Sequence, residues 1–212
     1  MANDAYLSKQ SDAERGGHIM FIVIEGLDGA GKSTIARELA EVISAELLST
    51  PGVKFNNIRS EIDEIYKDNH QARQLFYMST VVSMSEQVRE LISQGKNVIV
   101  DRYWISTQVY HQWKSENKHF ELTEVEKHIL RPDVTLFLDL SFEQRKKRLM
   151  SRKNITLEDN LTLEKSSDEK LNKLYSELAN TNIAGRWLSI KADVAVCDVV
   201  KNICAELYGT DN

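Results

Sequence analysis

The residues with the clearest chemistry form an eight-residue run, GLDGAGKS, at positions 26–33. This run fits the pattern G-x-x-x-x-G-K-[ST], and it follows an apolar segment and opens an amphipathic one. In that context the loop N–H groups and the helix amino end bind phosphate oxygens. Lys32 would reach the outer phosphates, and the Ser33 hydroxyl would hold Mg²⁺. We therefore predict an ATP·Mg²⁺ site built from Gly26, Gly29, Ala30, Gly31, Lys32, Ser33 and Thr34.

A second pair of charged residues follows a second apolar segment. Residues 97–101 read NVIVD, so the segment ends in Asp101, and Arg102 follows directly. In an open parallel sheet the carboxyl ends of the strands face the ligand crevice. We expect Asp101 to order Mg²⁺ or its waters beside Ser33. We expect Arg102 to meet a phosphate that the first loop does not hold.

Short apolar segments that alternate with longer amphipathic ones must position these residues. The apolar segments predict strands at 20–25, 46–49, 97–101, 134–140 and 187–190. The amphipathic segments predict helices at 32–45, 56–67, 71–93, 141–152, 161–178 and 194–208. The pattern indicates an α/β P-loop NTPase fold, with a mostly parallel five-stranded sheet flanked by helices.

Two polar segments lie outside this alternation. Residues 1–19 lack both the apolar core of a secretory signal and the Arg-rich character of a transit peptide, which favours a disordered leader. Residues 20–212 would then form a single P-loop domain. Residues 153–167 are polar and join two predicted helices. We expect a helical lid at about 148–167.

Composition excludes several kinds of partner. The net charge of −5 gives no general basic surface for nucleic acid. No apolar run reaches the roughly 18 residues of a membrane span. Cys197 and Cys204, seven residues apart in a predicted helix, favour two buried thiols over a disulfide, which suits the cytoplasm.

Several local motifs together resemble the thymidylate kinase family. The resemblance covers nearly everything after residue 20 and rests on EGLD at 25–28, DRY at 101–103 followed by Ser106, Thr107 and Tyr110, and RPD at 131–133. The segment DRYWIST at 101–107, and Ser-Thr-Pro at 49–51, are also similar to the mitochondrial UMP/CMP kinase of the same superfamily.

The resemblance implies roles for the acceptor-side residues. Asp28 would bind the 3′-hydroxyl of the acceptor sugar, and Arg102 would clamp the acceptor phosphate. Phe76 would stack on a pyrimidine base, whereas its spacing alone also fits an apolar position of an amphipathic helix. Tyr110 would pack against the sugar, and Ser106 belongs to the same substrate-binding set. The resemblance also implies a homodimer.

The moving phosphoryl group needs positive charge, because this transfer depends mainly on positioning and electrostatics. Some family members carry that charge as an arginine inside the loop, where this chain has Gly29. We therefore expect the lid to supply it, with Arg152 as first choice and Arg148 or Lys153 next. Solvated helix charges are the alternative interpretation of these residues.

Two departures from the family pattern leave the acceptor base open. Ser49 and Thr50 stand where a thymidylate kinase has an arginine for the acceptor phosphate, and residues 79–81 lack its base-reading arginine. The family favours phosphorylation of dTMP to dTDP, and the departures favour dUMP, dCMP, UMP or CMP.

Three rival functions would share the phosphate loop. A deoxynucleoside kinase would need a carboxylate base, for which Glu25 is the candidate, but Arg102 argues for an acceptor that already carries phosphate. A non-catalytic nucleotide-binding protein would bind ATP without turnover. A regulatory GTPase is disfavoured because the chain has no Asn-Lys-x-Asp guanine box.

Overall fold

The computed structural model describes residues 19–55, 57–115, 120–152 and 157–209. In these ranges five parallel strands form one sheet in the order β2-β3-β1-β4-β5. The strands are β1 (Phe21–Glu25), β2 (Glu46–Ser49), β3 (Val98–Asp101), β4 (Val134–Asp139) and β5 (Arg186–Lys191). The predicted α/β fold and five-stranded sheet are confirmed, and the sheet is parallel throughout.

The central strand β1 shows why these segments form buried strands. Its five residues, FIVIE, are all buried. Ile22 and Ile24 belong to one hydrophobic core, and Phe21 and Val23 belong to the other. Because side chains alternate across a strand, a continuous apolar run supplies both faces of a sheet that is covered on each side.

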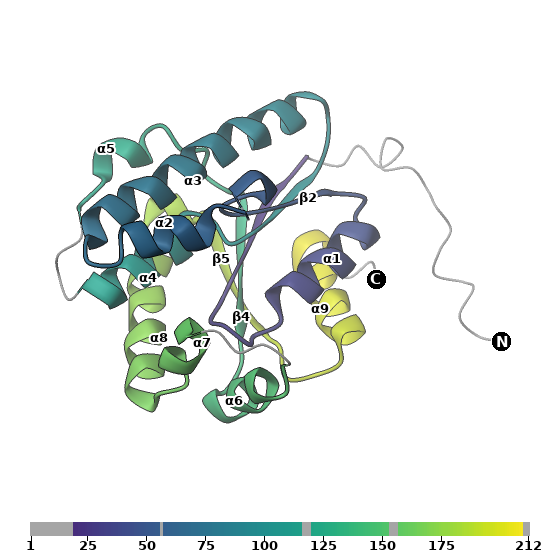
Figure 1. Cartoon of the computed structure of the whole chain (residues 1–212). Helices are drawn as coiled ribbons and strands as arrows, with labels where there is room; N and C mark the ends of the chain where they lie inside the picture. Colours follow the sequence, from purple (N-terminus) through teal and green to yellow (C-terminus); the bar gives the residue numbers. More distant parts are fainter. Residues whose placement is uncertain (1–18, 56, 116–119, 153–156, 210–212) are drawn as a thin grey trace.

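Helices cover both faces of the sheet (Figure 1). On one face, α1 (Lys32–Val42) packs against α9 (Val196–Tyr208), and both contribute to the core that contains Ile22. On the other face lie α3 (His70–Ser93), α4 (Trp104–Ser115) and α8 (Lys165–Ala179). The remaining elements are α2 (Arg59–Ile65), α5 (Thr123–Glu126), α6 (Phe142–Met150), α7 (Leu157–Thr162) and the short 3₁₀ turns η2 (Val53–Phe55) and η3 (Asn182–Ala184).

Some helix predictions need correction. The helix predicted at 56–67 is shorter, and the one at 161–178 divides into α7 and α8. Helix α4 was not predicted at all. It contains Trp104, Ile105 and Val109, types with modest helix propensity, and burial against α3 and α8 stabilises it.

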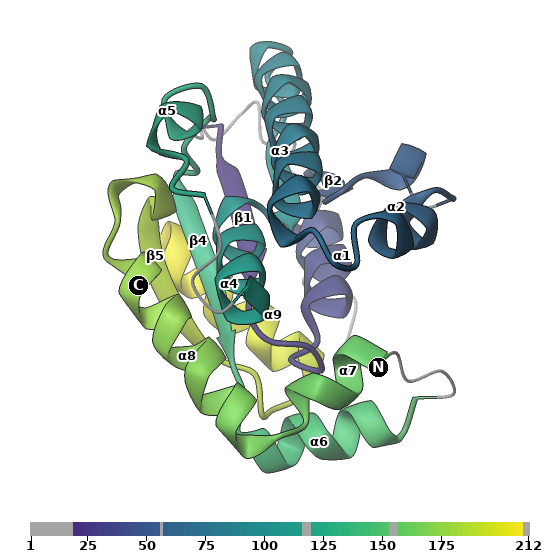
Figure 2. The ribbon, with the colours of Figure 1, turned by 60° about the vertical axis from the view of Figure 1, so that its left-hand side comes forward.

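The loops after β1 and β3 meet at one edge of the sheet. Ile24 pairs with Asp101, so the end of β3 lies beside the start of the phosphate loop. Helices α6 and α7 lie at this same edge (Figure 2). The described part of the predicted lid is therefore next to the phosphate loop, whereas its residues 153–156 lie outside the described ranges. The expected leader also lies outside them, except for Ile19.

The prediction of two buried thiols in α9 is wrong. Cys197 is exposed, Cys204 is partly buried, and both are free. The buried face of this helix consists of Val199, Val200 and Ile203. Among the helices of the described ranges, none has the length and apolar character needed to cross a membrane.

Candidate active site

The phosphate loop connects β1 to α1. Gly31 adopts a left-handed conformation, with φ of 98°, at the start of α1, and its carbonyl accepts the first helical bonds from Thr34 and Ile35. The Lys32 side chain is 6% exposed, and its Nζ donates to the Leu27 carbonyl at 2.9 Å. The ammonium group is therefore folded back over the loop, where it can meet a phosphate.

Within the phosphate loop, Gly29 is the position that most clearly requires glycine. Its φ is +85°, and a Cβ there would lie 2.9 Å from Leu149 Cγ and 3.1 Å from the Arg145 carbonyl. A side chain would thus be strained and would collide with α6. In this chain an arginine at this position would displace Leu149 or the loop, which agrees with the need for positive charge from elsewhere.

Ser33 and Asp101, which were predicted to hold a metal ion, lie in contact. The Ser33 hydroxyl donates to Asp101 Oδ2 at 2.6 Å. Asp101 Oδ1 is buried and has no hydrogen-bond partner among the described residues. A buried carboxylate oxygen without a partner is costly unless a ligand satisfies it. One hydroxyl and one carboxylate suit Mg²⁺, which takes few protein ligands and completes its shell with water and substrate phosphates.

Asp28, Arg102 and Tyr110 form one cluster beside the loop. Arg102 pairs with Asp28 Oδ1, and the Tyr110 hydroxyl donates to Oδ2 at 2.7 Å. The Arg102 guanidinium also lies 5.2 Å from the centre of the Tyr110 ring. Asp28 Oδ1 is 3.9 Å from Lys32 Nζ. One carboxylate therefore lies between the lysine predicted for the donor and the arginine predicted for the acceptor.

The charges around Asp28 control its ionisation. Burial alone disfavours the carboxylate, but Arg102, Lys32 and the Tyr110 hydroxyl outweigh burial and hold the pKa of Asp28 well below its usual value. Burial likewise opposes the charge of Arg102, yet Asp28 raises the pKa of Arg102 well above its usual value. Both groups are therefore charged throughout the physiological range.

The backbone at Arg102 is held in an uncommon conformation. Its φ is 67°, which is unusual for a residue with a side chain. Its N–H donates to the Ile24 carbonyl at 3.0 Å, and its own carbonyl accepts from the Thr50 hydroxyl at 2.9 Å. Thr50, which belongs to the segment that departs from the family pattern, thus helps to orient Arg102.

Glu25 is buried beneath the site, where it holds the start of α4 in place. Its side chain is fully buried, and Oε1 accepts the N–H groups of Tyr103 and Ser106, each at 3.1 Å. Oε2 lies 3.5 Å from the Tyr175 hydroxyl. Burial raises the pKa of Glu25. Because its oxygens bind the amino end of α4 and Tyr175, Glu25 is poorly placed as the base that a deoxynucleoside kinase requires.

Ser106 and Phe76 occupy different settings. Ser106 is 3% exposed, and its hydroxyl donates to the Tyr103 carbonyl at 3.4 Å, so it supports α4 and is not open to a ligand in this structure. Phe76 is partly buried in α3, with its ring centre 5.8 Å from that of Phe55 and 5.3 Å from that of Tyr77. An aromatic cluster therefore lies between η2 and α3, where the acceptor base was expected.

The two predicted lid arginines differ in their contacts. Arg148 donates to the Ala30 carbonyl at 3.1 Å and to the Ala192 carbonyl at 2.8 Å, so its guanidinium lies against the phosphate loop. Arg152 follows α6, is 48% exposed and pairs with Asp159 of α7 at 3.5 Å. Arg148 thus contacts the phosphate loop, whereas Arg152 contacts α7 and not the loop.

Sequence reasoning missed Arg145. Its side chain is 1% exposed, and it donates to the Asp28 carbonyl at 2.6 Å and pairs with Asp168 of α8. Lys146, Lys147 and Arg148 follow it, so the run is typical of a solvated helix face. The available signal was the spacing of Arg145 and Leu149, which lie four apart and share one face of α6.

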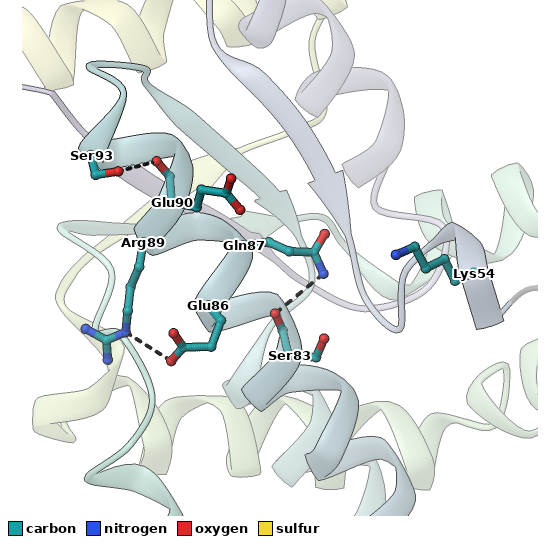
Figure 3. Close-up of a pocket in the computed structure, with 7 residues that line it drawn as sticks. All are labelled: Lys54, Ser83, Glu86, Gln87, Arg89, Glu90 and Ser93. Atoms are coloured by element: carbon teal, nitrogen blue, oxygen red, sulfur yellow. Dashed lines mark hydrogen bonds and ion pairs between the residues drawn. The ribbon is translucent and has the colours of Figure 1, made fainter.

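A surface hollow lies away from these residues, along the outer face of α3 (Figure 3). Six of its lining residues belong to α3, and Lys54 of η2 faces them. Within it Arg89 pairs with Glu86 at 3.4 Å and also donates to the His128 carbonyl at 3.3 Å. None of the predicted site residues lines it.

The environment of Lys32 leads to a prediction about pH. Burial and the nearby Arg102 lower the pKa of Lys32 to about 8, despite the carboxylates of Asp28, Asp101 and Glu25. Phosphate binds the ammonium form, so below pH 8 the free protein is already charged correctly. Above pH 8 binding must take up a proton, and ATP affinity should fall by up to about tenfold per pH unit.

Isothermal titration of ATP between pH 6.5 and 9.5, in buffers of different ionisation enthalpy, checks this expectation. Proton uptake should be small near pH 6.5, reach about half a proton near pH 8 and approach one proton at higher pH. The matched variant Lys32→Met should bind more weakly at every pH and should lose the uptake. An ATP affinity that stays constant to pH 9.5 in the unmodified protein would contradict the assigned contact.

The fold and these residues define a P-loop nucleotide kinase. Comparison with protein families matches residues 24–203 to the thymidylate kinase family. The chain therefore belongs to the thymidylate kinase family and is a phosphotransferase of the nucleoside monophosphate kinase type.

Individual relatives agree with this assignment. The chain is 32% identical over 192 residues to a probable thymidylate kinase of Thermococcus onnurineus, covering 81% of this chain and 92% of the relative. It is 33% identical over 150 residues to a thymidylate kinase of Chlorobium luteolum, covering 65% and 70% of the two chains.

Solved structures support the fold. A thymidylate kinase from Candida albicans superposes with a TM-score of 0.68 at 24% identity, covering 89% of this chain and 91% of that one. A deoxyadenosine kinase from M. mycoides superposes with a TM-score of 0.65 at 23% identity, covering 89% and 98%.

Proposed function

We propose that this protein transfers the γ-phosphoryl group of ATP, with Mg²⁺, to a pyrimidine nucleoside monophosphate, and that dTMP is the main acceptor. The observation that carries the proposal is the position of Asp28, which pairs with Arg102 and lies 3.9 Å from Lys32. Two cations that suit two separate phosphates thus flank one carboxylate. This arrangement favours an acceptor that already carries a phosphate group.

In this mechanism the loop N–H groups and Lys32 hold the donor phosphates. Ser33 and Asp101 would hold Mg²⁺, which would neutralise charge on those phosphates. Arg102 orients the acceptor phosphate. Little covalent help is needed, because the barrier is lowered mainly by alignment and by fixed positive charge.

The lid arginines complete the positive charge in this proposal. Arg148 already lies against the loop through the Ala30 carbonyl. Arg152 is largely exposed beside α7 and is the candidate to move inward when the lid closes. Closure would exclude water, which otherwise would accept the phosphoryl group.

On the acceptor side, Phe76 would present a stacking face and Tyr110 a wall beside the sugar. Asp28 would bind the 3′-hydroxyl after exchanging one of its present partners. The aromatic cluster around Phe76 supports a small pyrimidine ring. Ser106 supports α4 and contributes to this site indirectly.

Selectivity among the pyrimidine bases depends on residues 79–81, which lack the arginine that contacts the base in thymidylate kinases. Thr80 stands one turn after Phe76, is 1% exposed and donates to the Tyr77 carbonyl at 2.7 Å. A site without such a reading side chain discriminates mainly by fit, which is worth about 1–3 kcal/mol. The thymidylate kinase of Candida albicans has a broad substrate specificity, which supports the same expectation here.

We therefore expect dTMP to exceed dUMP by no more than about 100-fold in kcat/KM. We also expect dCMP, UMP and CMP to be used, and AMP and GMP to be poor acceptors. Steady-state kinetics with ATP and this panel of monophosphates measure both expectations. A clear preference for AMP or GMP would overturn the acceptor-site assignment.

Three controls separate the rival functions in the same assay. Thymidine and deoxycytidine test a deoxynucleoside kinase, which would use them in preference to the monophosphates. A reaction without acceptor measures ATP hydrolysis. Chelation of Mg²⁺ should abolish transfer. A protein that binds ATP but turns over no acceptor would be a non-catalytic nucleotide-binding protein.

The setting of the enzyme is a further part of the proposal. Family resemblance leads us to propose a homodimer. The two free cysteines, Cys197 and Cys204, suit a cytoplasmic location. We also propose that residues 20–212 act as a single kinase domain.

A further inference from the structure

Arg145 is buried although it lies in a helix of charged residues. Helix α6 reads FEQRKKRLM, yet the Arg145 side chain is only 1% exposed. Removing a guanidinium from water costs several kcal/mol unless partners satisfy it. The partners of the Arg145 guanidinium therefore identify the segments that this side chain links.

One guanidinium joins three segments of the chain. Arg145 Nη1 donates to the Asp28 carbonyl of the phosphate loop at 2.6 Å. Nη2 donates to the Thr162 carbonyl at the end of α7, at 3.4 Å, and pairs with Asp168 in the first turn of α8. The second Asp168 oxygen accepts from Asn172 Nδ2 at 3.1 Å. Asp168 is 9% exposed, so the pair is sheltered from solvent.

Two further contacts connect the same helices to the loop. Leu149 of α6 occupies the space that a side chain at Gly29 would need. The Tyr175 hydroxyl of α8 lies 3.5 Å from the Gly26 carbonyl. Helices α6 and α8 thus contact the loop near its beginning, at Gly26, and in its middle, at Asp28 and Gly29.

We propose that Arg145 is a positioning residue for phosphoryl transfer. Asp168 neutralises its charge, and its guanidinium holds the Asp28 carbonyl in place. Through this contact, helices α6 and α8 would set the position of the phosphate loop relative to the donor and acceptor phosphates. The predicted change in kcat rests on the proposed function. The predicted change in loop mobility does not depend on it.

The variant Arg145→Met should affect alignment more than affinity. The loop N–H groups, Lys32 and Arg102 remain, so the KM values for ATP and acceptor should stay within about threefold. A loop displaced by about 1 Å costs on the order of 100-fold in rate, so kcat should fall by at least about 30-fold. Arg145→Lys keeps the positive charge but loses the planar guanidinium with its several N–H donors. Its kcat should lie between those of Arg145→Met and the unmodified protein.

Arg186→Met is the matched control. Arg186 is about half exposed and pairs with Glu206 at 3.9 Å, away from the loop. Its kcat should equal that of the unmodified protein. All rates are measured at least 15 °C below each variant's melting temperature, with the folded fraction checked by circular dichroism. If Arg145→Met loses stability but keeps its kcat, the role is structural only and the proposal is overturned.

A double variant tests whether Asp168 acts through Arg145. Asp168→Asn should lower kcat, but it should add little further loss in the Arg145→Met background, because the route to the loop is already broken. Full additivity of the two losses would overturn the proposed link. Should Arg145→Met fail to fold, Arg145→Lys and Asp168→Asn decide the question by the same kcat and KM criteria.

Amide hydrogen exchange gives a readout without turnover. In Arg145→Met, exchange of residues 26–31 should rise by tenfold or more relative to the unmodified protein, whereas β4 and β5 should stay unchanged. If the unmodified protein phosphorylates no monophosphate, the proposed function fails, and this measurement still decides the positioning role. Unchanged exchange in an active protein would overturn the positioning role and leave the function intact.

Discussion

Lys32→Ala should lower kcat by at least about 1000-fold, which corresponds to about 4 kcal/mol of lost transition-state stabilisation. Lys32 is the buried cation of the phosphate loop, and its Nζ is held at 2.9 Å from the Leu27 carbonyl. Without it, charge on the outer phosphates is uncompensated as the phosphoryl group moves. Steady-state kinetics with saturating ATP and dTMP measure the loss.

The fold should tolerate this change. Truncating Lys32 removes a buried charge, whose desolvation cost also disappears. Circular dichroism and thermal unfolding should show a folded protein. The matched control Lys201→Ala removes an exposed lysine of α9, which pairs with Asp198 at 4.0 Å, and should leave kcat unchanged. Retention of more than a tenth of the activity in folded Lys32→Ala would refute the donor-site assignment.

Arg102→Ala should reduce kcat/KM for the acceptor by about 1000-fold and change the ATP dissociation constant by less than about threefold. The variant removes the guanidinium assigned to the acceptor phosphate, and it also leaves Asp28 without its closest cation. Charge-assisted bidentate contacts are among the strongest that a phosphate can make. Separate titrations of ATP and dTMP, followed by kinetics, separate the two effects.

Two variants test the geometry of this contact. Arg102→Lys keeps one positive charge but loses the planar fork, so its loss should be intermediate, about 10-fold to 100-fold. Arg89→Ala removes an exposed arginine of α3 and should change neither the ATP dissociation constant nor kcat/KM for the acceptor. An equal loss of ATP and acceptor affinity in Arg102→Ala would remove the assignment of Arg102 to the acceptor.

Helix α4 marks a limit of sequence-based prediction in this fold. The long helix α3 was predicted to within one residue. Helix α4 was missed because Trp104, Ile105 and Val109 have little intrinsic preference for helix. Its amino end is instead stabilised by Glu25, which accepts the Ser106 N–H, and by burial on both sides. Glu25 lies 81 positions before Ser106, and the covering helices α3 and α8 lie outside the segment, so this support leaves no local pattern.

The sequence by itself determined the phosphate loop, the approach of Ser33 to Asp101 and the sheet. These depend on short-range rules: the spacing of Gly26, Gly31, Lys32 and Ser33, and apolar runs that end in a charged residue such as Asp101. Because parallel strands end at one edge, the approach of Ser33 to Asp101 followed from topology alone.

The tertiary structure decided the partners of each charge. Asp28 and Arg102 are 74 residues apart, and Arg145 and Asp28 are 117 apart, so neither contact has a sequence period. Arg148 and Arg145 belong to one charged run, yet the orientation of α6 turns both toward the loop. Which charges in such a run are buried depends on helix packing, because only packing supplies the carbonyls and carboxylates that offset the loss of water.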